Sequence, residues 1–248
     1  MFLRKICCIY VLLFINIQVM AADITLLAST GVSSMMKVVL LDFEKKTGHH
    51  IKVSYDTSNL LMKRIQAGES VDLVILTAPL IDELTQSGKL TSGSRVDLAK
   101  SGIGVAIQSG KTKPDISSPE ALKKALLETS SVAYTATGAS GIYFSKVIDQ
   151  LGIGDQVKAK SKTPPGGIIA EIVAKGEAEM GVQMISELTN VKGTQLVGPL
   201  PGNLQMFTIF SAGVMKDAKD PQLVKSLIQF LSTQESVAVY KKQGMEPI

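Results

Sequence analysis

The sequence predicts an α/β protein built as two lobes. Short apolar strands alternate with segments of helical apolar spacing, the pattern of repeated βα units. Two loops rich in proline, glycine or lysine, at 108–119 and 198–202, flank the points where the chain would cross between lobes. A glycine follows six of the predicted helices, as a left-handed helix end requires: Gly48, Gly68, Gly88, Gly152, Gly176 and Gly244.

Each expected strand is a short apolar run, and together they cover 23–28, 51–55, 73–77, 103–107, 131–135, 180–183, 195–197 and 207–214. The expected helices cover 32–46, 59–67, 80–87, 119–127, 141–151, 167–175, 221–231 and 234–243. The crossing points divide the chain into one discontinuous lobe, 22–102 plus 204–248, and one continuous lobe, 103–203.

Residues 1–21 have the form of a secretory signal peptide. Arg4 and Lys5 precede an apolar run over 6–19, and a small-x-small triplet ends at Ala21. The run is shorter than the ~20 residues that a membrane-spanning helix needs. We therefore expect a mature protein that begins near Ala22 and resides outside the cytoplasm.

Composition excludes several classes of function. Cys7 and Cys8 lie within the signal, so the mature chain should have no disulfide, thiol nucleophile or zinc–thiolate site. The formal net charge of +4 falls to +2 without Arg4 and Lys5, and the charges are interspersed, which argues against a nucleic-acid partner. The only histidines adjoin each other in a predicted loop and predict no metal site. No cofactor motif and no nucleophile elbow is present, and the catalytic residues, if any, are unassigned.

Four segments place small or hydroxyl-bearing residues just before a predicted helix: 29–34, 56–59, 135–141 and 164–167. A helix start offers unpaired N–H groups and partial positive charge, and hydroxyls add neutral donors. Each segment alone is equally an ordinary helix cap. Three of them follow strands, and ligands of α/β sheets bind beyond the carboxyl ends of strands. The set predicts a shared cleft for a small anion, with Asp56 and Glu187 as candidate cleft acids and Asp72 as structural.

The order of several motifs resembles type II periplasmic solute-binding proteins, in particular the molybdate-binding proteins of ABC transporters. The matching stretches are 24–29, 43–48, 65–73, 141–143, 176–181 and 240–244. The resemblance implies two α/β lobes, each a mixed sheet flanked by helices, joined by two crossing strands and closing on the ligand. It also implies a monomer that delivers its anion to an ABC permease in the inner membrane.

In molybdate binders the oxyanion is held by two serines, two backbone amides and a tyrosine. By local match the serine positions fall on Gly31 and Ser58, the amides on Ser140 and Gly166, and the tyrosine on Met184. Neighbouring hydroxyls and an amide are expected to replace the missing donors. The expected ligand-binding set is Ser29, Thr30, Gly31, Thr57, Ser58, Tyr134, Thr137, Ser140, Gly166, Gln183 and Met184.

Four further stretches, 94–99, 113–117, 131–134 and 181–188, resemble a branch of the same superfamily that includes a periplasmic aconitate isomerase. This resemblance implies an alternative, an enzyme that moves a proton within a bound tricarboxylate. Such a ligand would favour cationic partners, and Lys63, Arg64 and Arg95 are the candidates. The sequence thus leaves two functions open: capture of a molybdate-like or tungstate-like oxyanion or small carboxylate for transport, or isomerisation.

Overall fold

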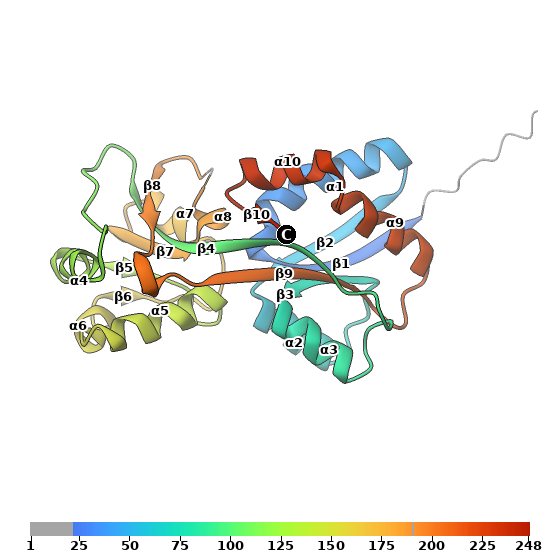
Figure 1. Ribbon diagram of the computed structural model, residues 1–248, viewed down its shortest axis with the longest axis horizontal. Helices are drawn as coiled ribbons and strands as arrows, with labels where there is room; N and C mark the ends of the chain where they lie inside the picture. The colour runs from blue at the N-terminus through green and yellow to red at the C-terminus, as the bar shows by residue number, and fades with distance from the viewer. Residues whose placement is uncertain (1–21, 190) are drawn as a thin grey trace, which may run out of the picture.

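The structure, a computed structural model, describes residues 22–189 and 191–248. The predicted signal peptide and both cysteines lie outside these residues. Two lobes lie side by side along the long axis of the molecule, and two long strands run between them (Figure 1). The prediction of a two-lobed α/β fold is confirmed. Paired strands follow the order β2-β1-β3-β9-β4-β7-β5-β6, with β8 and β10 also paired to β4.

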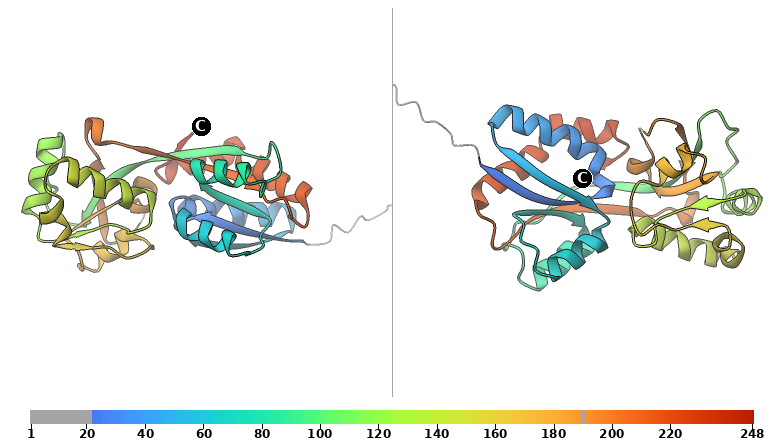
Figure 2. Two further views of the ribbon diagram at one scale, coloured as in Figure 1. Left: turned by 90° about the horizontal axis from the view of Figure 1, so that it is seen from below. Right: turned by 180° about the vertical axis from the view of Figure 1, so that it is seen from behind.

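Lobe 1 is a mixed sheet covered by helices on both faces. On β1, Ile24, Leu26 and Ala28 belong to one apolar core, whereas the intervening Leu27 belongs to another. This period of two reflects a strand buried on both faces. Helices α1, α9 and α10 cover one face and α2 and α3 the other (Figures 1 and 2). The elements are β1 (Asp23–Ser29), η1 (Thr30–Val32), α1 (Ser33–Thr47), β2 (His50–Asp56), α2 (Ser58–Gln66), β3 (Leu73–Thr77), α3 (Ala78–Gln86), α9 (Pro221–Leu231), α10 (Gln234–Lys242) and β10 (Glu246–Pro247).

Lobe 2 has its own core, in which Tyr134 packs edge-on against Phe144 with ring centroids 5.2 Å apart. Strand β7 pairs in parallel with β5 and antiparallel with β4. The elements are α4 (Pro119–Glu128), β5 (Val132–Ala133), α5 (Ala139–Gln150), α6 (Gly154–Lys158), β6 (Ser161–Lys162), α7 (Ile169–Ala174), β7 (Met180–Met184), α8 (Ile185–Leu188), β8 (Thr194–Pro199) and η2 (Gly202–Leu204).

The crossing strands are β4 (Val96–Gln108) and β9 (Phe207–Val214). Strand β4 pairs with β9 as far as Gly102 and with β7 from Ile103 onward. We therefore propose lobe boundaries at 102/103 and 203/204, and use lobe 1 and lobe 2 in that sense.

The prediction of a strand at 103–107 was too short, because β4 begins at Val96. Its first half carries Asp97 and Lys100, which interrupt the apolar run. Asp97 accepts a hydrogen bond from Ser211 Oγ (2.6 Å), and Lys100 pairs with Glu246 (3.2 Å). Because these partners on β9 and β10 satisfy the polar side chains, the strand can include them. The partners are distant in sequence, so the local pattern does not show this.

Other differences are local. The expected strand at 131–135 forms only over Val132–Ala133, and the short helices α6 and α8 were not predicted, since four or five residues show no helical period. All six glycines predicted to end helices have positive φ angles, which confirms that prediction. Within 22–189 and 191–248, no helix combines the length and the hydropathy of a membrane span.

Candidate functional site

A small cavity of about 20 Å³ lies between the lobes. This is room for about one water molecule, so the lobes are closed on each other. Residues from both lobes line it: Ser29, Thr30, Gly31, Thr57, Ser58, Thr77, Thr135, Gly138, Ala139, Ser140, Gln183, Met184, Glu187 and Phe210. A ligand larger than water therefore enters by parting the lobes.

Lobe 1 contributes two buried serine hydroxyls. Ser29 ends β1, and its Oγ accepts a hydrogen bond from Gly31 N (3.4 Å). Ser58 begins α2, and its Oγ accepts from Thr77 N (3.2 Å). Among the described residues neither hydroxyl has an acceptor for its own proton. Because a hydroxyl donates one hydrogen bond and accepts others, both serines remain free to donate into the cavity.

Lobe 2 contributes the start of α5. No side chain caps this helix, whose N-cap residue is Gly138, and Ser140 in its first turn is buried. The first N–H groups of a helix have no acceptor within the helix and carry partial positive charge. The α5 start therefore brings a hydroxyl and backbone donors to the cavity from the side opposite Ser29 and Ser58.

Thr135, which precedes the α5 start, has a buried hydroxyl without a partner. Its Oγ1 is one of two such side-chain atoms in the described part of the chain, and the residue is 1% exposed. A buried polar group left unpaired costs about 1–3 kcal/mol. Thr135 lies in one of the four donor-rich segments, 135–141, but was not among the expected ligand-binding residues. A ligand atom in the cavity would supply the missing partner.

Replacing Thr135 with valine is expected to change stability and affinity in opposite directions. The variant removes the unpaired hydroxyl, so the free energy of unfolding of the ligand-free protein should rise by about 1–3 kcal/mol, while ligand affinity falls. Urea unfolding and calorimetric titration measure the two quantities. The matched control is Thr129→Val, which should destabilise, because Thr129 Oγ1 already bonds Glu179 (3.0 Å). Equal destabilisation by both variants would contradict a ligand role for Thr135.

Glu187 on α8 also lines the cavity and is 7% exposed. Burial raises the pKa of its carboxyl to about 7, although hydrogen bonds from the Thr30 hydroxyl and the Met184 backbone act in the opposite direction. Its Oε1 accepts from Gln183 Nε2 (3.0 Å). Among the residues that the structure describes, no other titratable side chain lines the cavity. Of the two candidate cleft acids, the structure places Glu187 in the cavity wall, whereas Asp56 is outside it and accepts from Thr57 N (2.7 Å).

Gln183 was expected to bind the ligand, but its amide is already occupied. Besides Glu187, its Nε2 donates to Gly167 O (2.8 Å), and its Oε1 accepts from Ile169 N at the start of α7 (2.7 Å). The side chain lines the cavity and positions Glu187, with no amide proton left for a ligand.

Three other expected residues lie outside the cavity lining. Tyr134 is in the lobe 2 core, against Phe144. Gly166 adjoins Asp56 and Thr57 of lobe 1. Thr137 contacts lobe 1 through its hydroxyl, which lies 2.8 Å from Thr57 Oγ1.

Thr137 belongs to one of two hydrogen-bonded clusters that join the lobes beside the cavity. Asn59 Nδ2 donates to Thr137 O (2.8 Å) in the first. In the second, Ser186 Oγ donates to Gly31 O (2.8 Å), and Ser34 Oγ donates to Ser186 O (3.2 Å). These bonds connect groups about 80 to 155 positions apart in sequence, and they hold the lobes closed.

Replacing Ser186 with alanine is expected to favour the open form. Loss of the bond to Gly31 O removes about 1 kcal/mol from closure, which corresponds to about a fivefold lower affinity. Small-angle X-ray scattering should show a larger radius of gyration without ligand. Ser226→Ala is the control, because its hydroxyl bonds Leu223 O within one helix. An unchanged radius of gyration and affinity would contradict the assigned role.

Phe210 of β9 accounts for the glycine at position 31. A Cβ atom on Gly31 would lie 2.3 Å from Phe210 Cζ, so the ring fills the space of a side chain there. A serine donor at position 31 is therefore excluded without movement of Phe210. Together with Met184, the ring gives the cavity an apolar wall.

The three cations considered for a carboxylate ligand are not in the cavity lining. Arg64 pairs with Glu69 (2.6 Å), and Arg95 pairs with Asp97 (2.9 Å) and Asp82. Lys63 is exposed on α2. Among the described residues no Lys, Arg or His lines the cavity, so its donors are hydroxyls and the backbone N–H groups of helix starts.

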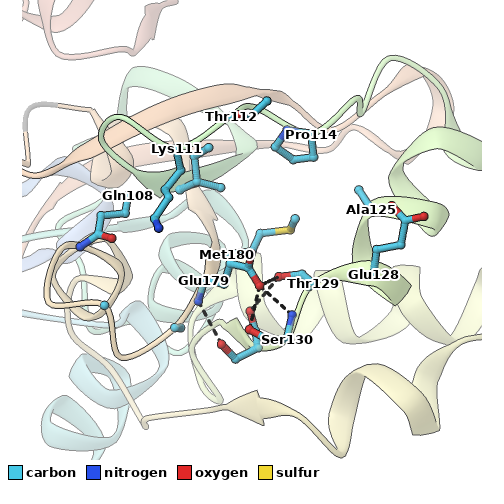
Figure 3. A pocket seen from close by; sticks show the side chains of 14 residues that line it. Gln108, Lys111, Thr112, Pro114, Ala125, Glu128, Thr129, Ser130, Glu179 and Met180 are labelled. Atoms are coloured by element: carbon cyan, nitrogen blue, oxygen red, sulfur yellow. Dashed lines mark hydrogen bonds between the residues drawn. The ribbon is translucent and has the colours of Figure 1, made fainter.

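A larger cavity of about 420 Å³ lies on lobe 2, at the opposite end of β7 (Figure 3). Met180 at the start of β7 lines it, whereas Met184 at the end of β7 lines the cavity between the lobes. Its Glu179 accepts from Ser130 N (2.7 Å), Ser130 Oγ (2.7 Å) and Thr129 Oγ1 (3.0 Å). With Glu128 and Glu179 against Lys111, this cavity is the less suitable of the two for an anion.

Known proteins resemble this chain over most of its length. The family model for bacterial extracellular solute-binding proteins matches residues 24–246. An aconitate isomerase from a Pseudomonas species is 31% identical over 231 residues, which cover 91% of this chain and 88% of that protein. The molybdate-binding protein ModA of Azotobacter vinelandii is 26% identical, with 90% of each chain covered. The solved periplasmic molybdate-binding protein of the same organism has the same fold, with a TM-score of 0.76, 18% identity, and coverage of 90% of this chain and 98% of that one. The chain belongs to the bacterial extracellular solute-binding protein family.

Proposed function

We propose that this chain is a periplasmic solute-binding protein that captures a small anion between its lobes for an ABC transporter. One observation carries the proposal: a closed cavity lined from both lobes by buried hydroxyls, an uncapped helix start and the unpaired Thr135 Oγ1. Neutral donors of this kind bind an anion without a full cation. The expected signal peptide and the family support export, and action as a monomer follows from the resemblance.

The apolar wall favours a small carboxylate over a tetrahedral oxyanion. An oxyanion such as molybdate or tungstate presents oxygen on every side and needs donors all round. By the local match to molybdate binders, one serine donor falls on Gly31, where Phe210 fills the space of a side chain, and the tyrosine falls on Met184. A carbon skeleton can pack against these two residues while its carboxylates accept from Ser29, Ser58 and Ser140.

Calorimetric titration of the purified protein tests the proposal. The panel comprises molybdate, tungstate, sulfate, phosphate, citrate, cis-aconitate and trans-aconitate. The expected result is saturable binding of at least one carboxylate, with weaker binding of the tetrahedral oxyanions. No binding by any member of the panel would contradict capture of a small anion of this class.

Glu187 supports a second candidate function, isomerisation of a small unsaturated carboxylate. A carboxyl with a pKa of about 7 can both accept and return a proton near neutral pH. It would take a proton from a carbon beside a substrate carboxylate and return it at the far end of the allylic system, so the double bond moves. The 31% identity to an aconitate isomerase agrees with this chemistry.

Ultraviolet absorbance of cis- or trans-aconitate incubated with the protein tests the second candidate, because the isomers absorb differently. The expected result is a protein-dependent change that Glu187→Gln abolishes. No change in absorbance at high protein concentration would contradict aconitate isomerisation, and anion capture would remain as the proposed function.

A further inference from the structure

The surroundings of Glu187 favour a neutral carboxylic acid, which can donate a hydrogen bond, over an ionised carboxylate. Its carboxyl is buried and forms no ion pair with any cation of the described residues. A buried ionised carboxylate without a cation is costly, and it would repel an anion in the same cavity.

The hydrogen bonds around Glu187 also determine which oxygen can hold a proton. Gln183 is oriented by its carbonyl, which accepts from Ile169 N (2.7 Å), so its Nε2 must face Gly167 O and Glu187 Oε1. Oε1 of Glu187 is therefore an acceptor. A proton on the carboxyl then belongs on Oε2. The Thr30 hydroxyl and the Met184 N–H also bond the carboxyl and oppose the effect of burial, and the Thr30 oxygen can accept as well as donate, so a protonated Oε2 still has a hydroxyl or a ligand oxygen to donate to.

We propose that Glu187 binds the ligand as a protonated hydrogen-bond donor, so that an ionised anion is captured together with one proton. The inference rests on the proposed capture of an anion and adds to it a specificity-determining residue. The site would thereby select anions whose oxygen can accept from a carboxylic acid, in addition to the hydroxyls and the α5 start. It is an alternative to the role of Glu187 in isomerisation, for which the carboxyl would have to be ionised when it takes the substrate proton.

Charged groups on the surrounding elements do not compensate a carboxylate at Glu187. The elements packed against α8 are β4, β7, β8, α1, α7 and η1, of which β7, β8 and η1 carry no titratable residue. Strand β4 carries Asp97 and Lys100, which pair with Arg95 and Glu246. The remaining charged residues are Glu171 on α7 and Lys37, Asp42, Glu44, Lys45 and Lys46 on α1. None of them is among the groups that shift the pKa of Glu187, which are burial, Thr30 and Met184.

The pH dependence of affinity tests the proposal. The probe is trans-aconitate, whose carboxyls are ionised throughout the range from about pH 6 to about pH 9. Since the pKa of Glu187 is about 7, wild-type affinity should be level below that pH and fall about tenfold per pH unit above it. Titration near pH 8 in two buffers of different ionisation enthalpy should show net uptake of about one proton.

Glu187→Gln supplies the decisive variant, because an amide N–H mimics the neutral donor at every pH. Its affinity should be independent of pH and exceed that of the wild type by up to about a hundredfold near pH 9. The matched control is Glu171→Gln, whose side chain is exposed on α7, and it should retain the wild-type profile. A level wild-type profile, or a variant that fails to bind at every pH, would overturn the proposal and indicate an ionised Glu187.

A ligand-free measurement separates this inference from the proposed function. The infrared difference between wild type and Glu187→Gln near pH 6 should contain the carbonyl stretch of a protonated carboxylic acid. If no anion binds but the band is present, the proposed function fails and the protonated state of Glu187 stands. If carboxylate bands appear in its place, the inference is wrong whatever binds.

Discussion

Removing the hydroxyls of Ser58 and Ser140 together is expected to weaken anion capture by about a hundredfold or more. Hydrogen bonds to a charged group contribute about 1.5–3 kcal/mol each, and the two serines act from opposite lobes. Ser58 Oγ already accepts from Thr77 N (3.2 Å), so its own proton is available to the ligand. Ser140 lies in the uncapped first turn of α5. Calorimetric titration of Ser58→Ala/Ser140→Ala against the best carboxylate measures the effect.

The control variant also removes two serine hydroxyls, but from positions outside the cavity. Ser161→Ala/Ser232→Ala removes two hydroxyls that bond nearby backbone carbonyls, Val157 O and Ile228 O, and neither lines the cavity. Its affinity should equal that of the wild type. Equal affinities for the cleft variant and the wild type would show that the ligand is not held by these serines.

Replacing Glu187 with glutamine is expected to stabilise the ligand-free protein at alkaline pH. Burial raises the pKa of Glu187 from 4.5 to about 7, so between these values the unfolded chain binds fewer protons than the folded chain. The free energy of unfolding of the wild type therefore falls as pH rises through this window, by about 3 kcal/mol in all. Glutamine does not titrate. Urea unfolding should show similar stabilities near pH 4 and a more stable variant near pH 8.

Glu179→Gln provides a control of opposite sign. Hydrogen bonds from Ser130 and Thr129 lower the pKa of Glu179, so its contribution to stability is present above the ordinary pKa and lost as pH falls. This variant should lose stability near neutral pH. If Glu187→Gln showed the same direction as Glu179→Gln, an ionised and favourably solvated Glu187 would be indicated.

The fold was largely predictable, because it follows from local patterns. Two such patterns depend only on neighbouring residues in the sequence. They are the apolar period of two in β1 and the glycines with positive φ that follow helices. The first half of β4 was not predictable, because an aspartate is unfavourable in a strand unless a partner bonds it. Asp97 accepts its hydrogen bond from Ser211, which lies more than a hundred positions later in the chain.

The candidate site was predictable only in part, for the same reason. The hydroxyls that end β1 and begin α2 and α5 are visible in sequence, and the structure brings Ser29, Ser58 and Ser140 to one cavity. No local pattern shows that Phe210 fills the space beside Gly31, or that Thr135 is left without a partner. Those facts depend on how distant segments pack.

The most direct test of anion capture between the lobes is a crystal structure of the protein grown with the tightest-binding anion of the panel. The predicted result is electron density for the anion in contact with Ser58 of lobe 1 and Ser140 of lobe 2, with the hydroxyl of Thr135 now paired. Density for the anion in the lobe 2 cavity beside Lys111 and Glu179 (Figure 3), or none between the lobes, would contradict the account.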